Sequence, residues 1–288
     1  MYKVVTKKFL NEAKTICLFE IEAPLVARHA KAGQFVIFRL DEQGERVPVS
    51  VAGWDREKGT VTVMVQAAGR TTKMLHTVEE GDYISDFVGP LGNATEIEGL
   101  EKVCVVGGGV GCAIAYPIAK VMHEAGIEVT FIAGFRSADI VILKDELAAV
   151  SDKLIICTDD GSYGEKGFTT QYLQQEIDAN IDQGKPQFDR VVAIGPDIMM
   201  KFLADVTRPY GISTIISLDP IMVDGTGMCG GCRVIVGGET KFACVDGPDF
   251  DAHQVDFDSL LKRSAFYKDE QEKASQHICK MTGGKRNG

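Results

Sequence analysis

The sequence predicts two domains, an antiparallel six-stranded β-barrel followed by an α/β domain with a parallel sheet, and then a C-terminal loop region rich in glycine and cysteine. The chain has 288 residues, which is long for one compact core and sufficient for two small ones. Short strand-like runs separated by turns fill the first third, and apolar strands alternate with helices in the middle. We therefore place the three parts at residues 1–97, 98–218 and 219–288.

The barrel prediction depends on strand-like runs that recur about every 10–15 residues, with glycines at or near the breaks. Even spacing of this kind is typical of small antiparallel barrels. One short helix is expected within this region, at Thr71–His76. The expected strands are Tyr2–Val5, Thr15–Ile21, Gln34–Leu40, Val47–Trp54, Thr60–Gln66 and Tyr83–Val88.

The α/β prediction depends on strands that are apolar throughout, because such strands are buried on both faces of a parallel sheet. From Leu218 the alternation stops, and the polar end of the chain, Lys280–Gly288, is expected to fray. The expected strands are Val103–Val106, Val129–Ala133, Leu154–Thr158, Arg190–Ile194 and Ser213–Ser217. The expected helices are Ala113–Glu124, Lys144–Val150, Thr169–Ile177 and Ile198–Val206.

Composition and charge exclude two classes of partner. A net charge of -10 argues against nucleic acid, which requires a basic surface. No run approaches the roughly 20 apolar residues that cross a bilayer, so no membrane association is expected. The first residues, Met1–Leu10, contain no continuous apolar segment of the kind found in signal peptides. We therefore expect a cytoplasmic protein whose cysteines stay reduced.

Three cysteines cluster in the glycine-rich loop. The segment Asp224–Cys232 reads DGTGMCGGC, and Cys244 follows a hairpin-like stretch, Arg233–Ala243. The glycines allow backbone N–H groups to approach sulfur closely. A C-x4-C-x2-C…C spacing is typical of plant-type [2Fe–2S] clusters, and here an aspartate stands where the first cysteine of that pattern would be. Since a carboxylate can bind iron, the candidate ligands are Asp224, Cys229, Cys232 and Cys244.

Two other interpretations fit the same loop. A structural zinc site could use the three cysteines together with Asp224 or His253, or the cysteines could bind no metal. The density of glycines favours the cluster, because a zinc site does not need so many close amides. The separate cysteines Cys17, Cys104 and Cys157 lie in strand-like runs and are expected to be buried and inert.

A second glycine-rich motif, GGGVGC at Gly107–Cys112, follows an apolar strand and opens a predicted helix. A helix N-terminus in that setting suits a dinucleotide pyrophosphate. The motif is not a complete G-x-G-x-x-G, so a tight strand-to-helix turn stays an alternative. Further turns follow later strands at Gly134–Arg136, Thr158–Gly161 and Gly195–Pro196. Because ligands of open α/β sheets bind outside the carboxyl ends of the strands, these loops together predict a dinucleotide site.

Two motifs in the barrel region combine cations and hydroxyls. They are RVPVS at Arg46–Ser50 and GRTT at Gly69–Thr72. Such groups suit a flavin, with Arg46 and the threonine hydroxyls on the pyrophosphate and Ser50 near the reactive edge of the ring. Each motif taken alone also fits an exposed strand charge or an ordinary helix N-cap.

In their order along the chain, these motifs resemble the ferredoxin–NADP reductase superfamily. The motifs are RVPVS, GRTT, GGGVG, DDGSYG, IGPDIMM and the cysteine loop. Within the superfamily they resemble the flavin and [2Fe–2S] subunits exemplified by the electron-transfer subunit of dihydroorotate dehydrogenase. The resemblance covers about residues 2–270. It implies an FAD-binding barrel, an NAD-binding α/β domain and a [2Fe–2S] loop.

At two positions the sequence differs from these relatives and resembles instead the small-subunit family of NADH-dependent reduced ferredoxin:NADP oxidoreductases, the sulfide dehydrogenase type. Val49 stands where other members carry a tyrosine that stacks on the flavin, which leaves open what covers that face. Asp224 replaces one of the four cysteines of the dihydroorotate relatives. The likeness implies a cluster held by one aspartate and three cysteines.

The resemblance also implies roles for a larger set of residues. Ser50 is the candidate catalytic residue beside the flavin. The candidate cofactor-binding residues of the barrel are Arg46, Val47, Pro48, Val49, Ser50, Val65, Gly69, Arg70, Thr71 and Thr72. Those of the α/β domain are Gly108, Gly109, Val110, Gly111, Gly134, Arg136, Asp159, Asp160, Gly161, Gly195, Pro196 and Met199.

The implied chemistry is hydride transfer between nicotinamide and FAD, followed by single-electron transfer to the cluster. The implied partner is a larger FAD and iron–sulfur subunit that binds NADPH and ferredoxin in flavin-based electron bifurcation. No NADP-type basic pair follows the strand before Arg136, and the resemblance also indicates NAD(H).

Three alternative functions stay open at this stage. One is the dihydroorotate electron-transfer subunit, which has the same cofactors and a different partner. Another is a stand-alone NADH:acceptor reductase. The third, of a different class, is a non-redox, zinc-containing nucleotide-binding protein.

Overall fold

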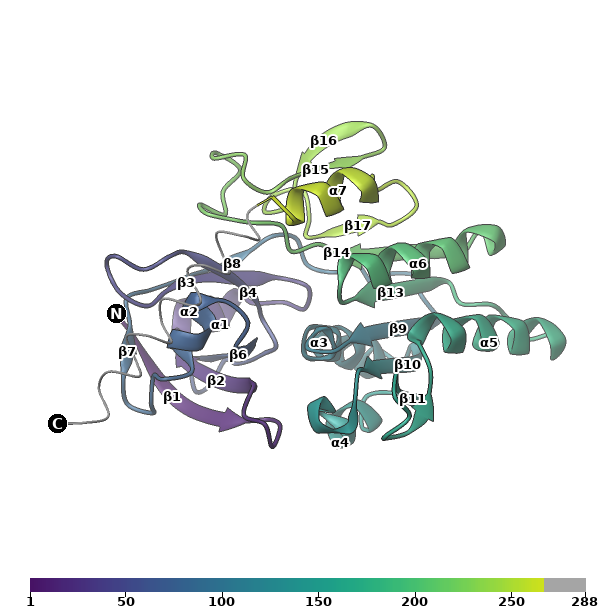
Figure 1. Cartoon of the computed structure of the whole chain (residues 1–288), viewed down its shortest axis with the longest axis horizontal. Coiled ribbons are helices and arrows are strands. Elements are labelled where there is room, and N and C mark those ends of the chain that lie inside the picture. Colours follow the sequence, from purple (N-terminus) through teal and green to yellow (C-terminus); the bar gives the residue numbers. More distant parts are fainter. Residues whose placement is uncertain (267–288) are drawn as a thin grey trace.

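The computed structural model describes residues 1–266, so the expected fraying of Lys280–Gly288 lies outside the described part of the chain. Figure 1 shows the N-terminal barrel beside the α/β domain, with the C-terminal region lying along both of them. The predicted order of barrel, parallel sheet and cysteine loop is therefore the observed order.

The barrel region has eight strands rather than the six expected, in sheets of order β5-β6-β2-β1-β7 and β4-β3-β8. The expected strand Val47–Trp54 divides because β4 pairs with β3 whereas β5 pairs with β6. The expected strand Tyr83–Val88 divides in the same way, because β7 pairs with β1 and β8 with β3. The strands are β1 (Tyr2–Phe9), β2 (Ile16–Glu22), β3 (Phe35–Arg39), β4 (Val47–Ser50), β5 (Gly53–Asp55), β6 (Thr60–Gln66), β7 (Tyr83–Ile84) and β8 (Asp86–Leu91).

Two short helices accompany the barrel. Helix α2 (Arg70–Leu75) was expected, and α1 (Pro24–His29) was not. A proline at the first position of α1 favours a helix start there, because proline has no N–H to leave unpaired. Phe19, Phe38 and Phe87 are among the largest fully buried side chains of the barrel core.

The α/β domain contains a sheet of order β12-β11-β10-β9-β13-β14-β17, in which all strands but β17 are parallel. Strand β9 is central, and the chain order reverses there, with β10 on one side and β13 on the other. Such a reversal is where open α/β sheets bind ligands. The strands are β9 (Lys102–Gly108), β10 (Glu128–Phe135), β11 (Lys153–Thr158), β12 (Glu165–Lys166), β13 (Arg190–Ile194), β14 (Ser213–Ser217) and β17 (Asp249–Asp251). The helices are α3 (Gly111–Glu124), α4 (Lys144–Ala148), α5 (Thr169–Asp182) and α6 (Asp197–Thr207).

The C-terminal region packs against both domains. The expected hairpin is present as β15 (Arg233–Val236) and β16 (Glu239–Phe242), and α7 (Phe257–Ser264) follows it. Strand β17 extends the α/β sheet by pairing antiparallel with β14. One buried cluster joins Phe35 and Ile37 of the barrel to residues of the sheet and of this region. These contacts hold the cysteine loop in one place relative to the barrel and the sheet.

Within residues 1–266, no helix combines the length and apolar character that crossing a bilayer requires.

Candidate functional site

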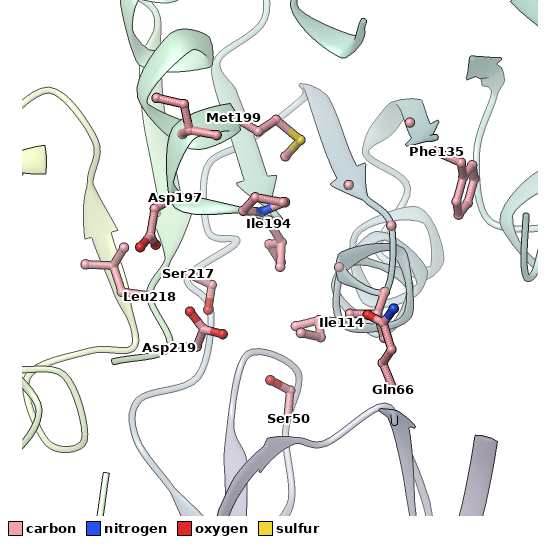
Figure 2. Close-up of a pocket in the computed structure, with 18 of the residues that line it drawn as sticks. Ser50, Gln66, Ile114, Phe135, Ile194, Asp197, Met199, Ser217, Leu218 and Asp219 are labelled. Carbon is pink, nitrogen blue, oxygen red and sulfur yellow. The ribbon is translucent and has the colours of Figure 1, made fainter. Parts of the chain in front are cut away.

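A cavity of about 1380 Å³ lies between barrel strand β4 and the carboxyl ends of β9, β10, β13 and β14 (Figure 2). It exceeds the usual volume of a pocket for one small ligand. Pro48, Val49 and Ser50 line it from the barrel, and Ile114 lines it from α3. The cavity is therefore placed where a ring held by the barrel can meet a nucleotide held by the sheet.

The turn from β9 into α3 forms the middle of the cavity wall. Gly109 has a positive φ of 56°, and a side-chain carbon added there would meet no atom within 4 Å. By contrast, a carbon added at Gly111 would lie 2.4 Å from the carbonyl oxygen of Ile194. Helix α3 has no side-chain cap and no acidic residue in its first turn. The turn thus offers an open helix N-terminus that fits a pyrophosphate.

Most of the other residues predicted to bind a dinucleotide line the same cavity. They are Gly108, Val110, Gly134, Arg136, Asp159, Gly195, Pro196 and Met199. Asp160 and Gly161 lie outside this lining. The Asp160 carboxylate accepts hydrogen bonds from the hydroxyl and the backbone N–H of Ser162, at 2.6 and 2.9 Å. These two bonds lower the pKa of Asp160 and orient it within its own turn.

Most of the expected barrel residues lie away from the cavity. Nε of Arg46 donates to the carbonyl oxygen of Val223, and its Nη1 lies 3.9 Å from the Asp86 carboxylate. The hydroxyl of Thr71 donates to the carboxylate of Glu45. Since the Thr71 hydroxyl already donates to Glu45, a phosphate that bound at Thr71 would have to displace the Glu45 carboxylate. The others outside the lining are Val47, Val65, Gly69, Arg70 and Thr72.

Two carboxylates of the cavity, Asp197 and Asp219, were not predicted from the sequence. Desolvation raises the pKa of Asp197, although the Ser264 hydroxyl donates to this carboxylate at 2.9 Å. Desolvation, and then the neighbouring Asp197, raise the pKa of Asp219 to about 6, even though its side chain is open to the cavity. Their position in the sequence could have indicated the site, because each aspartate follows the carboxyl end of a predicted parallel strand, where open α/β sheets bind ligands.

The four candidate metal ligands form two pairs. Sγ of Cys232 and Sγ of Cys244 lie 3.2 Å apart and are buried. Sγ of Cys229 lies 3.4 Å from a carboxylate oxygen of Asp224. The backbone N–H of Thr226, followed by bonds from Cys229 and Met228, lowers the pKa of Asp224 to about 2. The carboxylate is therefore held in the ionised form that binds metals.

This arrangement fits a two-iron centre better than a single zinc ion. In a [2Fe–2S] cluster each iron takes two protein ligands, and the loop offers two pairs. Burial, together with the neighbouring Cys232, raises the pKa of Cys244 to about 11, so a cation bound beside Cys244 would favour its thiolate form. Nowhere in residues 1–266 do three or more His, Cys, Asp or Glu side chains gather around one point. His253, considered for zinc, instead contacts the hydroxyl of Thr207 at 2.9 Å.

Comparison with known proteins gives the class first. The fold is shared with phthalate dioxygenase reductase, which is described as a modular structure for electron transfer from pyridine nucleotides to [2Fe–2S]. The two chains are 17% identical and superpose with a TM-score of 0.57, over 82% of this chain and 85% of the other. Residues 219–256 match the iron–sulfur cluster binding domain of dihydroorotate dehydrogenase B. These two matches give the fold and an iron–sulfur binding region at residues 219–256.

More similar proteins identify the family. The dihydroorotate dehydrogenase B (NAD+) electron transfer subunit homolog of Thermotoga maritima is 47% identical over 96% of this chain and 95% of its own length. The chain belongs to the family of these electron-transfer subunits and their homologues. A solved chain of the NADH-dependent reduced ferredoxin-NADP oxidoreductase, studied for flavin-based electron bifurcation, is 46% identical, with a TM-score of 0.88 over 96% of this chain and 97% of that one.

These matches confirm the family resemblance, the expected cofactor classes and the electron-transfer function predicted from the sequence. They confirm the barrel-plus-sheet architecture, while the strand count of the barrel is corrected as described above. The individual site residues and the domain boundaries stay predictions.

Proposed function

We propose that this chain carries electrons between NAD(H), an FAD beside Ser50 and a [2Fe–2S] cluster on Asp224, Cys229, Cys232 and Cys244, and passes them to or from a larger flavoprotein subunit. The observation that carries this proposal is the course of one short segment. Residues 219–222 form part of the cavity wall, and the first cluster ligand follows at Asp224. The cavity and the ligand pairs are therefore neighbours in the structure.

Several contacts hold this segment against the barrel. Gly225 has a φ of 78°, and a carbon added there would lie 2.7 Å from Leu91 and 2.8 Å from Ile37. The hydrogen bond that Arg46 donates to the carbonyl oxygen of Val223 holds the segment just before Gly225 against the barrel. We therefore propose that Arg46 sets the spacing between the flavin and cluster sites. A bound flavin would convert a hydride into single electrons, and the protein's part is to hold the two sites at a constant spacing.

The cluster loop also presents an apolar surface. The exposed fractions are 87% for Met228, 49% for Val223, 45% for Ile221 and 41% for Val245, and Cys229 beside them is exposed. Exposed apolar side chains gathered at one site mark protein interfaces. We propose that the larger subunit docks on this surface, so that electrons leave or enter through the cluster.

Anaerobic affinity purification from the native cell tests the proposal. Iron, inorganic sulfide and flavin are measured, together with the subunits that accompany the chain. We expect two irons per chain, FAD, and a larger flavoprotein carrying further iron–sulfur clusters. A colourless protein with one zinc per chain would refute the proposal. If the accompanying subunit were a dihydroorotate dehydrogenase, the chain would be the electron-transfer subunit of that enzyme, and the bifurcation part of the proposal would be wrong.

Substituting Asp224 by cysteine tests the carboxylate ligand. Thiolate donates more electron density to iron than carboxylate does, so Asp224→Cys should keep the cluster and move its midpoint potential to more negative values. Redox titration followed by electron paramagnetic resonance measures the shift. An unchanged midpoint in a normally assembled variant would show that Asp224 is not a ligand.

Two adjacent aspartates provide a matched test of nucleotide preference. Asp159 lines the cavity, whereas the Asp160 carboxylate is bonded to Ser162 outside the lining. A carboxylate beside the adenosine ribose repels a 2′-phosphate. Asp159→Asn should raise kcat/KM for NADPH relative to NADH by about tenfold, and Asp160→Asn should change it little. Equal effects of the two substitutions would place the ribose elsewhere.

A further inference from the structure

The cavity is electrically uneven along its length. Its described lining contains four charged side chains, Arg136, Asp159, Asp197 and Asp219. Arg136 and Asp159 follow β10 and β11 on one side of the central strand β9. Asp197 and Asp219 follow β13 and β14 on the other side, where no cation is found among the described lining residues. One end thus carries opposite charges, and the other carries carboxylates alone.

The position of Ser50 indicates which end receives the nicotinamide. In Figure 2, Ser50 of β4 lies on the same side of α3 as Asp219 and Ser217, and Phe135 of β10 lies on the opposite side. A dinucleotide whose pyrophosphate rests at Gly109 spans β9 in both directions. Only the end over β13 and β14 comes beside Ser50 and the proposed flavin ring. The nicotinamide therefore belongs at the end that carries the two aspartates.

The two carboxylates belong to rigid parts of the structure. Asp197 is the first residue of the eleven-residue helix α6, and its bond from the Ser264 hydroxyl ties it to the end of α7. Asp219 follows β14, and the N–H of the intervening Leu218 donates to the carbonyl oxygen of Pro248. The Asp197 carboxylate and the backbone beside Asp219 are therefore held in place, and in a partly desolvated space a charge acts strongly on its neighbours.

We propose that Asp197 and Asp219 make this site selective for the oxidation state of its nucleotide, so that it binds NAD+ more tightly than NADH. The inference rests on the proposed function, because it requires the nicotinamide in this cavity. The ring of NAD+ carries a positive charge, and the ring of NADH is neutral. A carboxylate that faces the ring therefore attracts the oxidised form and has little effect on the reduced form. By linkage, the same preference favours hydride leaving the bound nucleotide.

Binding to the anaerobic holoprotein tests this selectivity by calorimetry. The probes are NAD+ and tetrahydro-NAD, an unreactive analogue whose ring is neutral like that of NADH. In Asp219→Asn and in Asp197→Asn, the dissociation constant of NAD+ should rise about tenfold, with that of tetrahydro-NAD changing by less than about twofold. Asp205→Asn is the matched control, because this exposed carboxylate is also on α6 but lies outside the cavity lining.

A pH series on the wild-type protein gives a second measurement that needs no variant. Asp219 has a raised pKa of about 6, so it gains a proton as the pH falls through that value. NAD+ affinity should then weaken, while tetrahydro-NAD affinity stays level and Asp219→Asn loses the dependence. Asp197, the charged neighbour of Asp219, also has a raised pKa, so its protonation would weaken NAD+ binding in the same way. Asp159 lies at the other end of the cavity, beyond β9.

The outcomes separate this inference from the proposed function. If both nucleotides bind the wild-type protein and their affinity ratio is insensitive to pH and to both substitutions, the selectivity is refuted and the proposed function stands. If neither nucleotide binds the wild-type holoprotein, the proposed function fails and this inference fails with it. An equal loss of both affinities in the variants would also overturn the selectivity, because it would indicate a steric role.

Discussion

Replacing Cys232 by alanine is expected to remove the cluster and to stop electron transfer beyond the flavin, while NADH still reduces the flavin. Cys232 is buried, and its sulfur pairs with that of Cys244 at 3.2 Å. The substitution would leave one iron with a single protein ligand, which does not hold a [2Fe–2S] cluster. Iron and inorganic sulfide should fall to background. Reduction of the partner subunit should slow by about a hundredfold or more, because even the loss of a residue that only supports a metal ligand costs up to about a hundredfold.

The matched control is Cys157→Ala, which removes a buried sulfur from strand β11 of the α/β sheet. Absorption spectra and stopped-flow bleaching of the flavin by NADH give both readouts on the same sample. The control should keep its iron and its rates. A Cys232→Ala protein that retained two irons and normal transfer to the partner would contradict the ligand assignment.

The parallel sheet could be predicted because its strands are continuous apolar runs. Val103–Val106 and Val129–Ala133 are wholly or largely apolar, and each lies within an observed strand. The split of Val47–Trp54 could not be predicted in the same way. A run of strand-forming residues has the same pattern whether it stays in one sheet or crosses to another. Only the pairing of β4 with β3 and of β5 with β6 decides between these cases.

Two of the C-terminal elements, β17 and α7, were missed for a related reason. Strand β17 has only three residues, DFD, and two of them are charged, so the sequence alone gives no strand signal. It forms because β14 has an unpaired edge beside it. Helix α7 buries Phe257 and Leu260 against neighbouring elements, and these contacts are equally invisible in its largely polar sequence.

The candidate site shows the same division between local and long-range information. The set of four candidate ligands in the cysteine loop could be predicted from spacing, because all four residues lie on one short segment and its hairpin, whereas their division into two pairs comes from the structure. The aspartates at 197 and 219 are far apart in sequence, and each alone is typical of a helix start or a loop. The fold brings them to one cavity. Conversely, Thr71 looked like a phosphate ligand, and the structure places its hydroxyl on Glu45.

The substitution Gly109→Asp is expected to nearly abolish nucleotide binding without unfolding the protein. Gly109 has a φ of 56°, and a side-chain carbon there meets nothing within 4 Å, so the new carboxylate points into open space at the N-terminus of α3. Aspartate tolerates the left-handed conformation better than most residues, which limits the backbone strain. Its negative charge would occupy the place of the pyrophosphate and repel it. We expect NADH and NAD+ affinities to fall by about a hundredfold.

Gly109→Asn separates charge from size. Asparagine has nearly the same shape and the same tolerance for a positive φ, but it carries no charge. Its effect on nucleotide affinity should be about ten times smaller than that of aspartate, and the difference should shrink at high salt. Calorimetry measures the affinities, and thermal unfolding checks that both variants stay folded. If aspartate and asparagine weakened binding equally, the N-terminus of α3 would be acting through its shape and not through its field, and the pyrophosphate would have to lie elsewhere.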